Sequence, residues 1–224
     1  MKQKLLLFCT ICIFVALMAF GIVKKQTYTD LSGQENYLAQ IQVAELPENI
    51  AEKEYTDMSQ GLPDSAIILR VEVTGEIEHS FGVDMQKAVI REVYAGNELG
   101  KDEEVYIFSR HWQLIINGNL NLIERGFVNI MEVGTEYLVF AEAVSEDAKT
   151  GVPAVKLYDD FIVAPVFCYD NHQNVIMPIS DNGTYVSYKD VMDNEFFATS
   201  EETLKIMERL KSQMLSLYPR DENS

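Results

Sequence analysis

The chain contains little cysteine, with only Cys9, Cys12 and Cys168 among its 224 residues. The first two lie within an apolar N-terminal segment, so the rest of the chain has a single cysteine and cannot form a disulfide within the domain. Small exported domains are often held together by disulfides, and a stable fold here must depend on a hydrophobic core instead. Cys168 ends the apolar run 161–168 and is predicted to be a buried thiol.

Basic residues are also scarce. The chain has 18 Lys and Arg against 35 Asp and Glu, which gives a formal net charge of −17. Because Lys2 and Lys4 precede the apolar segment, the part of the chain beyond that segment carries −19. Such a surface repels nucleic acid and anionic lipid headgroups. The composition therefore argues against nucleic-acid binding and is compatible with a basic partner or with divalent cations.

Signatures of catalysis and of cofactor binding are missing as well. The sequence has no Gly-x-Ser-x-Gly elbow, no phosphate-binding glycine loop and no dinucleotide fingerprint. The three histidines are far apart and lack the spacing of metal ligands. Asp170, His172 and Asn174 have the spacing of an EF-hand loop, but Val175 occupies the position that requires glycine. We therefore predict no catalytic residue, no metal and no cofactor.

The first feature that is present is an uncharged apolar run from Leu5 to Val23. As a helix it measures roughly 28 Å, close to the thickness of a bilayer's hydrocarbon core. A short basic head before an apolar run is typical of an export signal. Residues 1–25 are predicted to form an N-terminal transmembrane anchor, with the N-terminus inside and the domain extracytoplasmic. Cleavage of this segment as a signal peptide is the alternative, and it gives a secreted protein.

Residues 26–60 are polar and contain few large apolar side chains. We predict a stalk that carries short ordered pieces. Thr56 is a candidate cap for one helical turn before residues 61–63 (Gly-Leu-Pro) interrupt it.

From Ala66 onward, short runs rich in β-branched and aromatic residues alternate with turn residues. The predicted strands are 67–77, 87–94, 104–109, the two arms of a hairpin at Asn117-Gly118, 136–144, and two or three more between 155 and 186. Many short strands at this spacing are typical of a barrel or sandwich. Thr199 and Glu202 form a capping box, and the apolar residues after it recur at helical spacing. They predict a C-terminal α-helix over about 200–217.

Four segments follow one another in the order of a known domain: residues 73–77 (VTGEI), 89–96 (VIREVYAG), 105–107 (VYI) and 133–140 (VGTEYLVF). Together they resemble the bacterial relatives of the netrin-like and tissue-inhibitor-of-metalloproteinases domain. The resemblance covers residues 64–144 and implies an OB-like five-stranded barrel. Inhibitors of that family insert an N-terminal cysteine into a protease's metal site and are held by disulfides, and this sequence has neither. Inhibition therefore does not carry over, and architecture alone does not assign function.

The predicted fold is thus mainly β: an OB-like five-stranded barrel with extra strands and a C-terminal α-helix, in a domain of residues 61–224 preceded by the stalk and the transmembrane helix. One cluster, Arg110, His111 and Trp112, is the candidate binding site, because Trp and Arg are enriched at binding hot spots. Trp112 shares a predicted strand face with Leu114 and Ile116, so a position in the core is the alternative.

The missing catalytic constellation favours a non-catalytic module that binds a protein or peptide partner at the cell surface. A second hypothesis is a binder of small ligands or cell-wall saccharides, because OB-type barrels can bind oligosaccharides on one face. A protease inhibitor or a hydrolase is a further alternative.

Overall fold

The computed structural model describes residues 41–80, 83–109, 114–117, 120–123, 127–146, 150–177 and 185–220, with Thr10 and residues 13–14 and 17–18. The chain divides into two units, Met1–Glu35 and Asn36–Ser224. The described residues of the first unit are helical. Among the described residues, no helix combines the length and the apolar character needed to cross a membrane. Most of the predicted anchor, and residues 26–40 of the predicted stalk, lie outside the described residues.

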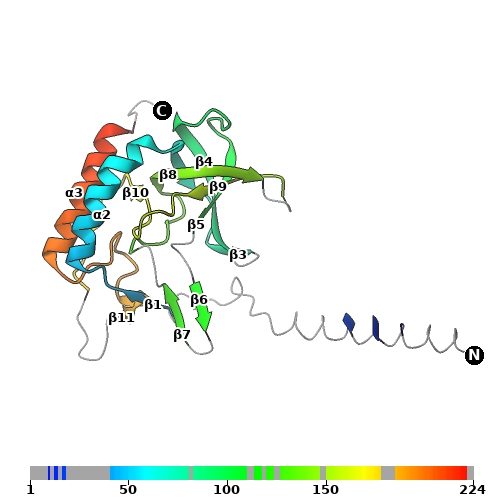
Figure 1. The fold of residues 1–224 in the computed structure, drawn as a ribbon, viewed down its shortest axis with the longest axis horizontal. Coiled ribbons are helices and arrows are strands. Elements are labelled where there is room, and N and C mark those ends of the chain that lie inside the picture. The colour runs from blue at the N-terminus through cyan, green and yellow to red at the C-terminus, as the bar shows by residue number, and fades with distance from the viewer. Residues whose placement is uncertain are drawn as a thin grey trace, which may run out of the picture. The chain divides into compact units, whose positions relative to one another are not determined.

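The second unit is mainly β and contains a closed five-stranded barrel (Figure 1). Its strands are β2 (Ile67–Val73), β4 (Val83–Ala95), β5 (Glu104–Ser109), β8 (Glu136–Glu146) and β9 (Pro153–Leu157). The order around the ring is β2-β4-β5-β9-β8, and β8 closes the ring by pairing with β2. The pairing of β5 with β9 is parallel, and the other four pairings are antiparallel. The predicted mainly β fold, with a five-stranded barrel and a C-terminal helix, is confirmed.

Alternation of side chains along the strands fills the barrel interior. On β2, Leu69, Val71 and Val73 are fully buried on one face, as the period-two pattern predicted. On the neighbouring strands, Ile90 of β4 and Ile107 of β5 are fully buried as well. The side chains between these positions point to the outside of the barrel, so the sequence pattern also decides which residues form its outer surface.

Two further strands extend the barrel sheet, and four strands form a second, smaller sheet. β3 (Glu78–Ser80) pairs with β4, and β10 (Val166–Cys168) pairs with β8. The second sheet has the order β11-β1-β7-β6; its strands are β1 (Ile41–Ala44), β6 (Leu114–Asn117), β7 (Leu120–Ile123) and β11 (Tyr185–Ser187). β6 and β7 are the arms of the predicted hairpin, and they pair antiparallel from Asn117 opposite Leu120.

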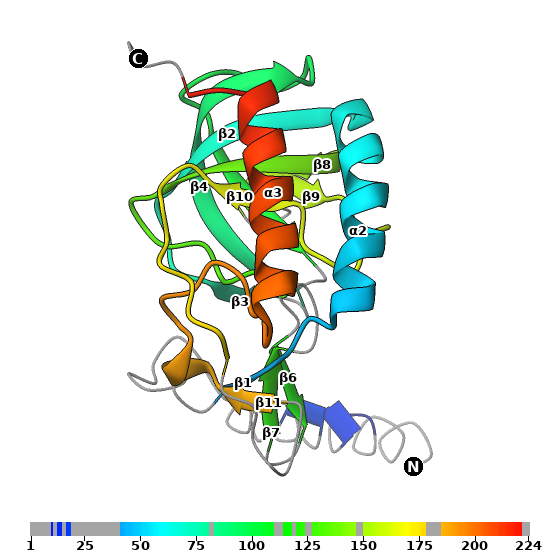
Figure 2. The same ribbon diagram turned by 90° about the vertical axis from the view of Figure 1, so that its left-hand side faces the viewer.

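Two helices lie side by side against one side of the barrel (Figure 2). They are α2 (Glu48–Gly61), which continues into the 3-10 turn η3 (Leu62–Asp64), and α3 (Glu201–Leu217); a second 3-10 turn, η4 (Tyr188–Asp190), follows β11. The core beneath the helices combines their apolar side chains with the outer faces of β2, β8 and β10. Its largest contributors include Met58, Phe140, Phe167, Met207 and Leu210.

Helix α2 differs from the prediction for its segment. Residues 48–60 were expected to belong to a polar stalk that carries short ordered pieces, with Thr56 as a candidate cap of one helical turn. They form most of a 14-residue helix packed into the core. The reason is that one of its buried positions is Glu54, beside Ala51 and Met58. A carboxylate in the buried stripe interrupts the apolar period from which a helix is predicted.

The N-terminus of α3 also differs in detail. Its cap is Ser200, whose Oγ accepts a hydrogen bond from the backbone N–H of Thr203 at 3.1 Å. Ser200 has an extended backbone, so its short side chain reaches the third residue of the helix. The predicted capping box at Thr199 is therefore one residue too early.

Candidate functional site

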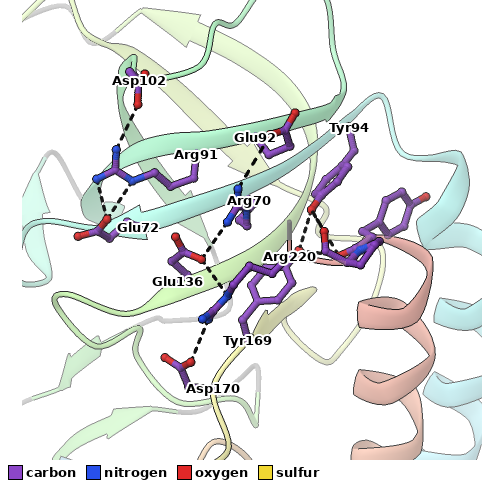
Figure 3. A network of polar contacts seen from close by, with 12 residues as sticks. Arg70, Glu72, Arg91, Glu92, Tyr94, Asp102, Glu136, Tyr169, Asp170 and Arg220 are labelled. Carbon is purple, nitrogen blue, oxygen red and sulfur yellow. Dashed lines mark hydrogen bonds and ion pairs between the residues drawn. The ribbon is translucent and has the colours of Figure 1, made fainter. Parts of the chain in front are cut away.

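A network of ion pairs closes the side of the barrel next to the end of α3 (Figure 3). At its centre, the buried Arg70 of β2 donates through Nη1 to Glu136 Oε2 at 3.2 Å. Arg220, just beyond α3, places Nε 3.0 Å from the same carboxylate oxygen and Nη2 2.9 Å from Asp170 Oδ1. One carboxylate therefore joins a buried arginine of the barrel to an arginine near the C-terminus.

Two tyrosine hydroxyls bind the backbone next to Arg220. The hydroxyl of Tyr94 donates to the Pro219 carbonyl at 2.6 Å, and that of Tyr169 donates to the Tyr218 carbonyl at 2.7 Å. Burial raises the pKa of Tyr169 above its ordinary value, so this hydroxyl remains a neutral donor at physiological pH. We call residues 218–220 the C-terminal clasp. Its hydrogen bonds and ion pairs hold residues 218–220 on the barrel, which indicates a structural role for the clasp.

The outer surface of β4 and β5 has a different character. On β5, Tyr106 and Phe108 alternate with the buried Val105 and Ile107, so both aromatic side chains lie on the outside, where they are half-buried. We call this surface, with the neighbouring strand β9, the β4–β5 face.

Cross-strand pairing places further residues beside the two aromatic rings. Met85 of β4 lies opposite Phe108, and Lys87 lies opposite Tyr106. On the other side, Lys156 of β9 is the parallel partner of Phe108. Directly paired residues share a face of the sheet, so the rings lie between a thioether and two ammonium groups. Such a surface can stack on an apolar or planar group.

Each basic side chain that the structure describes on this face and at its edge is already paired with a carboxylate. Lys87 Nζ lies 2.7 Å from Glu104 Oε1, and this contact is the main reason why the pKa of Lys87 is raised. Lys156 contacts Glu142 and also Asp159, the latter at 2.9 Å. These ammonium groups are therefore poor candidates for binding an anion.

At the edge toward β2, Arg91 of β4 is shared in the same way between two carboxylates. Its Nη2 lies 2.6 Å from Glu72 Oε2, and its Nη1 lies 3.2 Å from Asp102 Oδ1 (Figure 3). Positive charge on this side of the barrel is thus balanced, or exceeded, by neighbouring acids.

The one arrangement in the described residues that suggests nucleophilic chemistry is a thiol next to an imidazole. Cys168 Sγ lies 3.2 Å from His172 Nε2, and His172 Nδ1 lies 3.4 Å from the Asp193 carbonyl. With Nδ1–H directed at that carbonyl, Nε2 is free to accept the thiol proton. Cys168 is fully buried, however, and burial raises its pKa to about 12. The sulfur is thus a shielded neutral thiol, as the sequence predicted.

A buried carboxylate holds the segment that carries this thiol. Glu195 Oε1 accepts a hydrogen bond from the backbone N–H of Cys168 at 2.8 Å, and its other oxygen contacts Lys211 of α3. Burial raises the pKa of Glu195, and the neighbouring ammonium group offsets part of that rise. Lys211 also donates to the Asp170 carbonyl at 3.0 Å. These contacts fix the end of β10 to α3, and among the described residues no group of acidic, Cys and His side chains is arranged to hold a metal ion.

The burial of Cys168 predicts slow alkylation. At pH 8, about 10⁻⁴ of a thiol with a pKa of about 12 is ionised, against about a tenth of an ordinary cysteine thiol. In a Cys9→Ser/Cys12→Ser variant of the full chain, iodoacetamide should react with Cys168 about 10³-fold more slowly in the folded protein than in 8 M urea, as measured by mass spectrometry. Equal rates would show that the fold does not shield the thiol, and a faster rate in the folded protein would show that His172 activates it.

The predicted site residues Arg110, His111 and Trp112 lie outside the described residues. Their position in the chain is between β5, which ends at Ser109, and β6, which begins at Leu114. Sequence reasoning did not single out Tyr106 and Phe108. Their signal was present, since two aromatics alternate with two aliphatics in a predicted strand, but alternation alone does not say which of the two faces is the interior.

Comparison with known proteins adds no family: no protein-family model matches the chain, and no curated protein matches it.

Proposed function

We propose that the chain is a membrane-anchored, extracytoplasmic module that binds a protein or peptide partner and carries out no chemistry of its own. The observation that carries this proposal is the contrast between the two sides of the barrel. One side is closed by α2, α3 and the C-terminal clasp, and the other carries Tyr106 and Phe108 half-buried on its outer surface. The shielding of Cys168 supports the non-catalytic role.

The order of the strands supports an OB-like architecture for the barrel. Counted along the chain, its strands occur around the ring in the order 1-2-3-5-4, and the third and fifth are parallel. This is the Greek-key order of the OB barrel, in which the second and third strands commonly supply the ligand surface. Here these strands are β4 and β5. The resemblance of residues 64–144 to netrin-like domains is part of this proposal, because it also implies an OB-like barrel.

The location rests on the apolar run from Leu5 to Val23. Its described members Ile13, Phe14, Leu17 and Met18 are helical, and their side chains are exposed. Side chains of this kind favour a lipid environment, and the run is long enough to span one. If the segment is cleaved, the same domain is secreted.

Labelling on intact cells tests the location and the binding face together. Two variants are made in a Cys9→Ser/Cys12→Ser background: Tyr106→Cys, and Lys205→Cys as a matched control on the exposed surface of α3. Each is labelled with a membrane-impermeant maleimide–benzophenone and irradiated. We expect labelling of both cysteines from outside the cell, and a cross-linked partner from position 106 alone. Labelling only after lysis would contradict the location, and equal cross-links from both positions would contradict the face.

A saccharide ligand is the second candidate, because the flat aromatic pair beside the Glu104 carboxylate also suits a sugar ring. It predicts that wall fragments raise the melting temperature of the protein, since a ligand that binds only the folded state stabilises it.

A further inference from the structure

We infer that the partner presents a basic, extended polypeptide segment to the β4–β5 face and places a Lys or Arg side chain over Tyr106 or Phe108. This inference rests on the proposed function and names the chemistry of its partner. It is carried by the charge balance of the face, by the aromatic rings at its centre and by the spacing of those rings.

The charge balance of the face favours a cation. Strands β4, β5 and β9 contain three basic side chains, Lys87, Arg91 and Lys156, and carboxylates already contact each of them, two in the case of Arg91 and two in the case of Lys156. Those carboxylates are Glu72, Asp102, Glu104, Glu142 and Asp159. An arriving cation meets these carboxylates, whereas an anion would have to displace a carboxylate from each basic group.

The net charge of the whole chain also favours a basic partner. A net charge of −17 attracts a basic partner over distances longer than any single contact, and it repels nucleic acid and anionic lipid. Long-range attraction does not by itself select a face, so the aromatic rings must supply the position.

Aromatic rings attract cations that lie over their faces within about 6 Å. The chain already uses this contact elsewhere: Arg209 of α3 lies over the ring of Tyr55 at 3.9 Å from the centroid. Tyr106 and Phe108 are half-buried, so they keep exposed ring surface on the β4–β5 face. Lys156, the cross-strand partner of Phe108, contacts the Glu142 and Asp159 carboxylates, so a cation over the Phe108 ring shares its side of the sheet with a lysine that two acids already contact.

The spacing of the rings indicates an extended polypeptide rather than a small cation. Alternate residues of a strand are roughly 6.5–7 Å apart, so Tyr106 and Phe108 have the same period as the alternate side chains of an extended peptide. A peptide lying along β5 would bring two of its side chains to the two rings. Recognition would then require a basic residue at one of two alternate positions of the peptide, and two such residues would occupy both rings.

The test uses the full chain in nanodiscs of zwitterionic lipid and two fluorescent ten-residue peptides, one alternating Arg and Ser and one alternating Glu and Ser. Anisotropy should show saturable binding of the Arg-Ser peptide and none of the Glu-Ser peptide. Tyr106→Ser/Phe108→Ser, which keeps the net charge, should weaken binding at least tenfold. The matched control Glu201→Gln/Glu202→Gln removes two exposed charges from α3 and should change binding less than twofold. Thermal unfolding of each variant verifies that it is folded.

Three results would overturn the inference. The first is that the Arg-Ser peptide does not bind. The second is that the α3 control variant loses as much affinity for this peptide as the aromatic variant does, because equal losses indicate attraction by net charge alone. The third is a neutral chito-oligosaccharide that binds in place of the peptide and is lost in Tyr106→Ser/Phe108→Ser. Capture of a partner through position 106 on cells without any binding of basic peptides would refute this inference and leave the proposed function standing.

Discussion

Replacing Glu54 by alanine should lower the free energy of unfolding by about 3 kcal/mol, because a buried donor that loses its acceptor costs about 1–3 kcal/mol. Glu54 lies in α2 and is 2% exposed. Its Oε2 accepts hydrogen bonds from the backbone N–H groups of Ile162 at 2.8 Å and Val163 at 3.2 Å. This carboxylate therefore satisfies two donors of the loop between β9 and β10 at the point where that loop meets the core.

The same helix supplies the control. Glu52 is exposed, and Glu52→Ala makes an identical chemical change in α2, so it should cost less than about 0.5 kcal/mol. Glu54→Gln keeps one oxygen acceptor and should fall between the two. Urea unfolding of the full chain in a mild detergent measures all three variants. A Glu54→Ala variant as stable as Glu52→Ala would show that the loop finds other acceptors at little cost.

This carboxylate also explains why the sequence predicted the barrel better than the helices that cover it. The barrel strands are visible in the sequence as runs of β-branched and aromatic residues, and residues 69–73 also alternate between apolar and charged side chains. The buried stripe of α2 includes Glu54, whose partners lie more than a hundred residues further along the chain. No local pattern reveals a partner at that distance, so the segment was predicted to be stalk.

The outward orientation of Tyr106 and Phe108 also could not be predicted from the sequence. The alternation of residues 104–109 was visible in the sequence, but the choice between interior and exterior for Tyr106 and Phe108 depends on the strands beside them. The pairing of Met85 and Lys87 with these two residues shows that the rings lie on the outer face of the barrel. The pairing of Cys168 with His172 was equally hidden, because the four-residue spacing indicates a contact only on a helix, and here it spans the end of β10 and the loop after it.

Deleting residues 218–224 should destabilise the protein by about 2–4 kcal/mol. Three to four hydrogen bonds are worth about 1 kcal/mol each, and the half-buried ring of Tyr218 adds about 1 kcal/mol, less the entropy regained by the freed segment. The ring of Tyr218 packs 5.3 Å from that of Tyr94 and 5.6 Å from that of Phe140. Its loss, with that of the Tyr218 and Pro219 carbonyls, leaves two tyrosine hydroxyls without their backbone acceptors.

A shorter deletion, of residues 221–224, keeps the whole clasp and should leave stability unchanged. Arg220→Ala should cost less than about 1 kcal/mol, because its side chain is 39% exposed and ion pairs in contact with water are weak. The decisive readout is Tyr169, since burial is the main cause of its raised pKa. Without the clasp, water reaches its hydroxyl and its pKa falls, so ultraviolet titration should detect one more tyrosinate forming near pH 10 than in a Tyr218→Phe variant, which lacks the same hydroxyl but keeps the clasp. If the longer deletion changes neither stability nor this titration, the hydrogen bonds of Tyr94 and Tyr169 do not hold the C-terminal segment on the barrel.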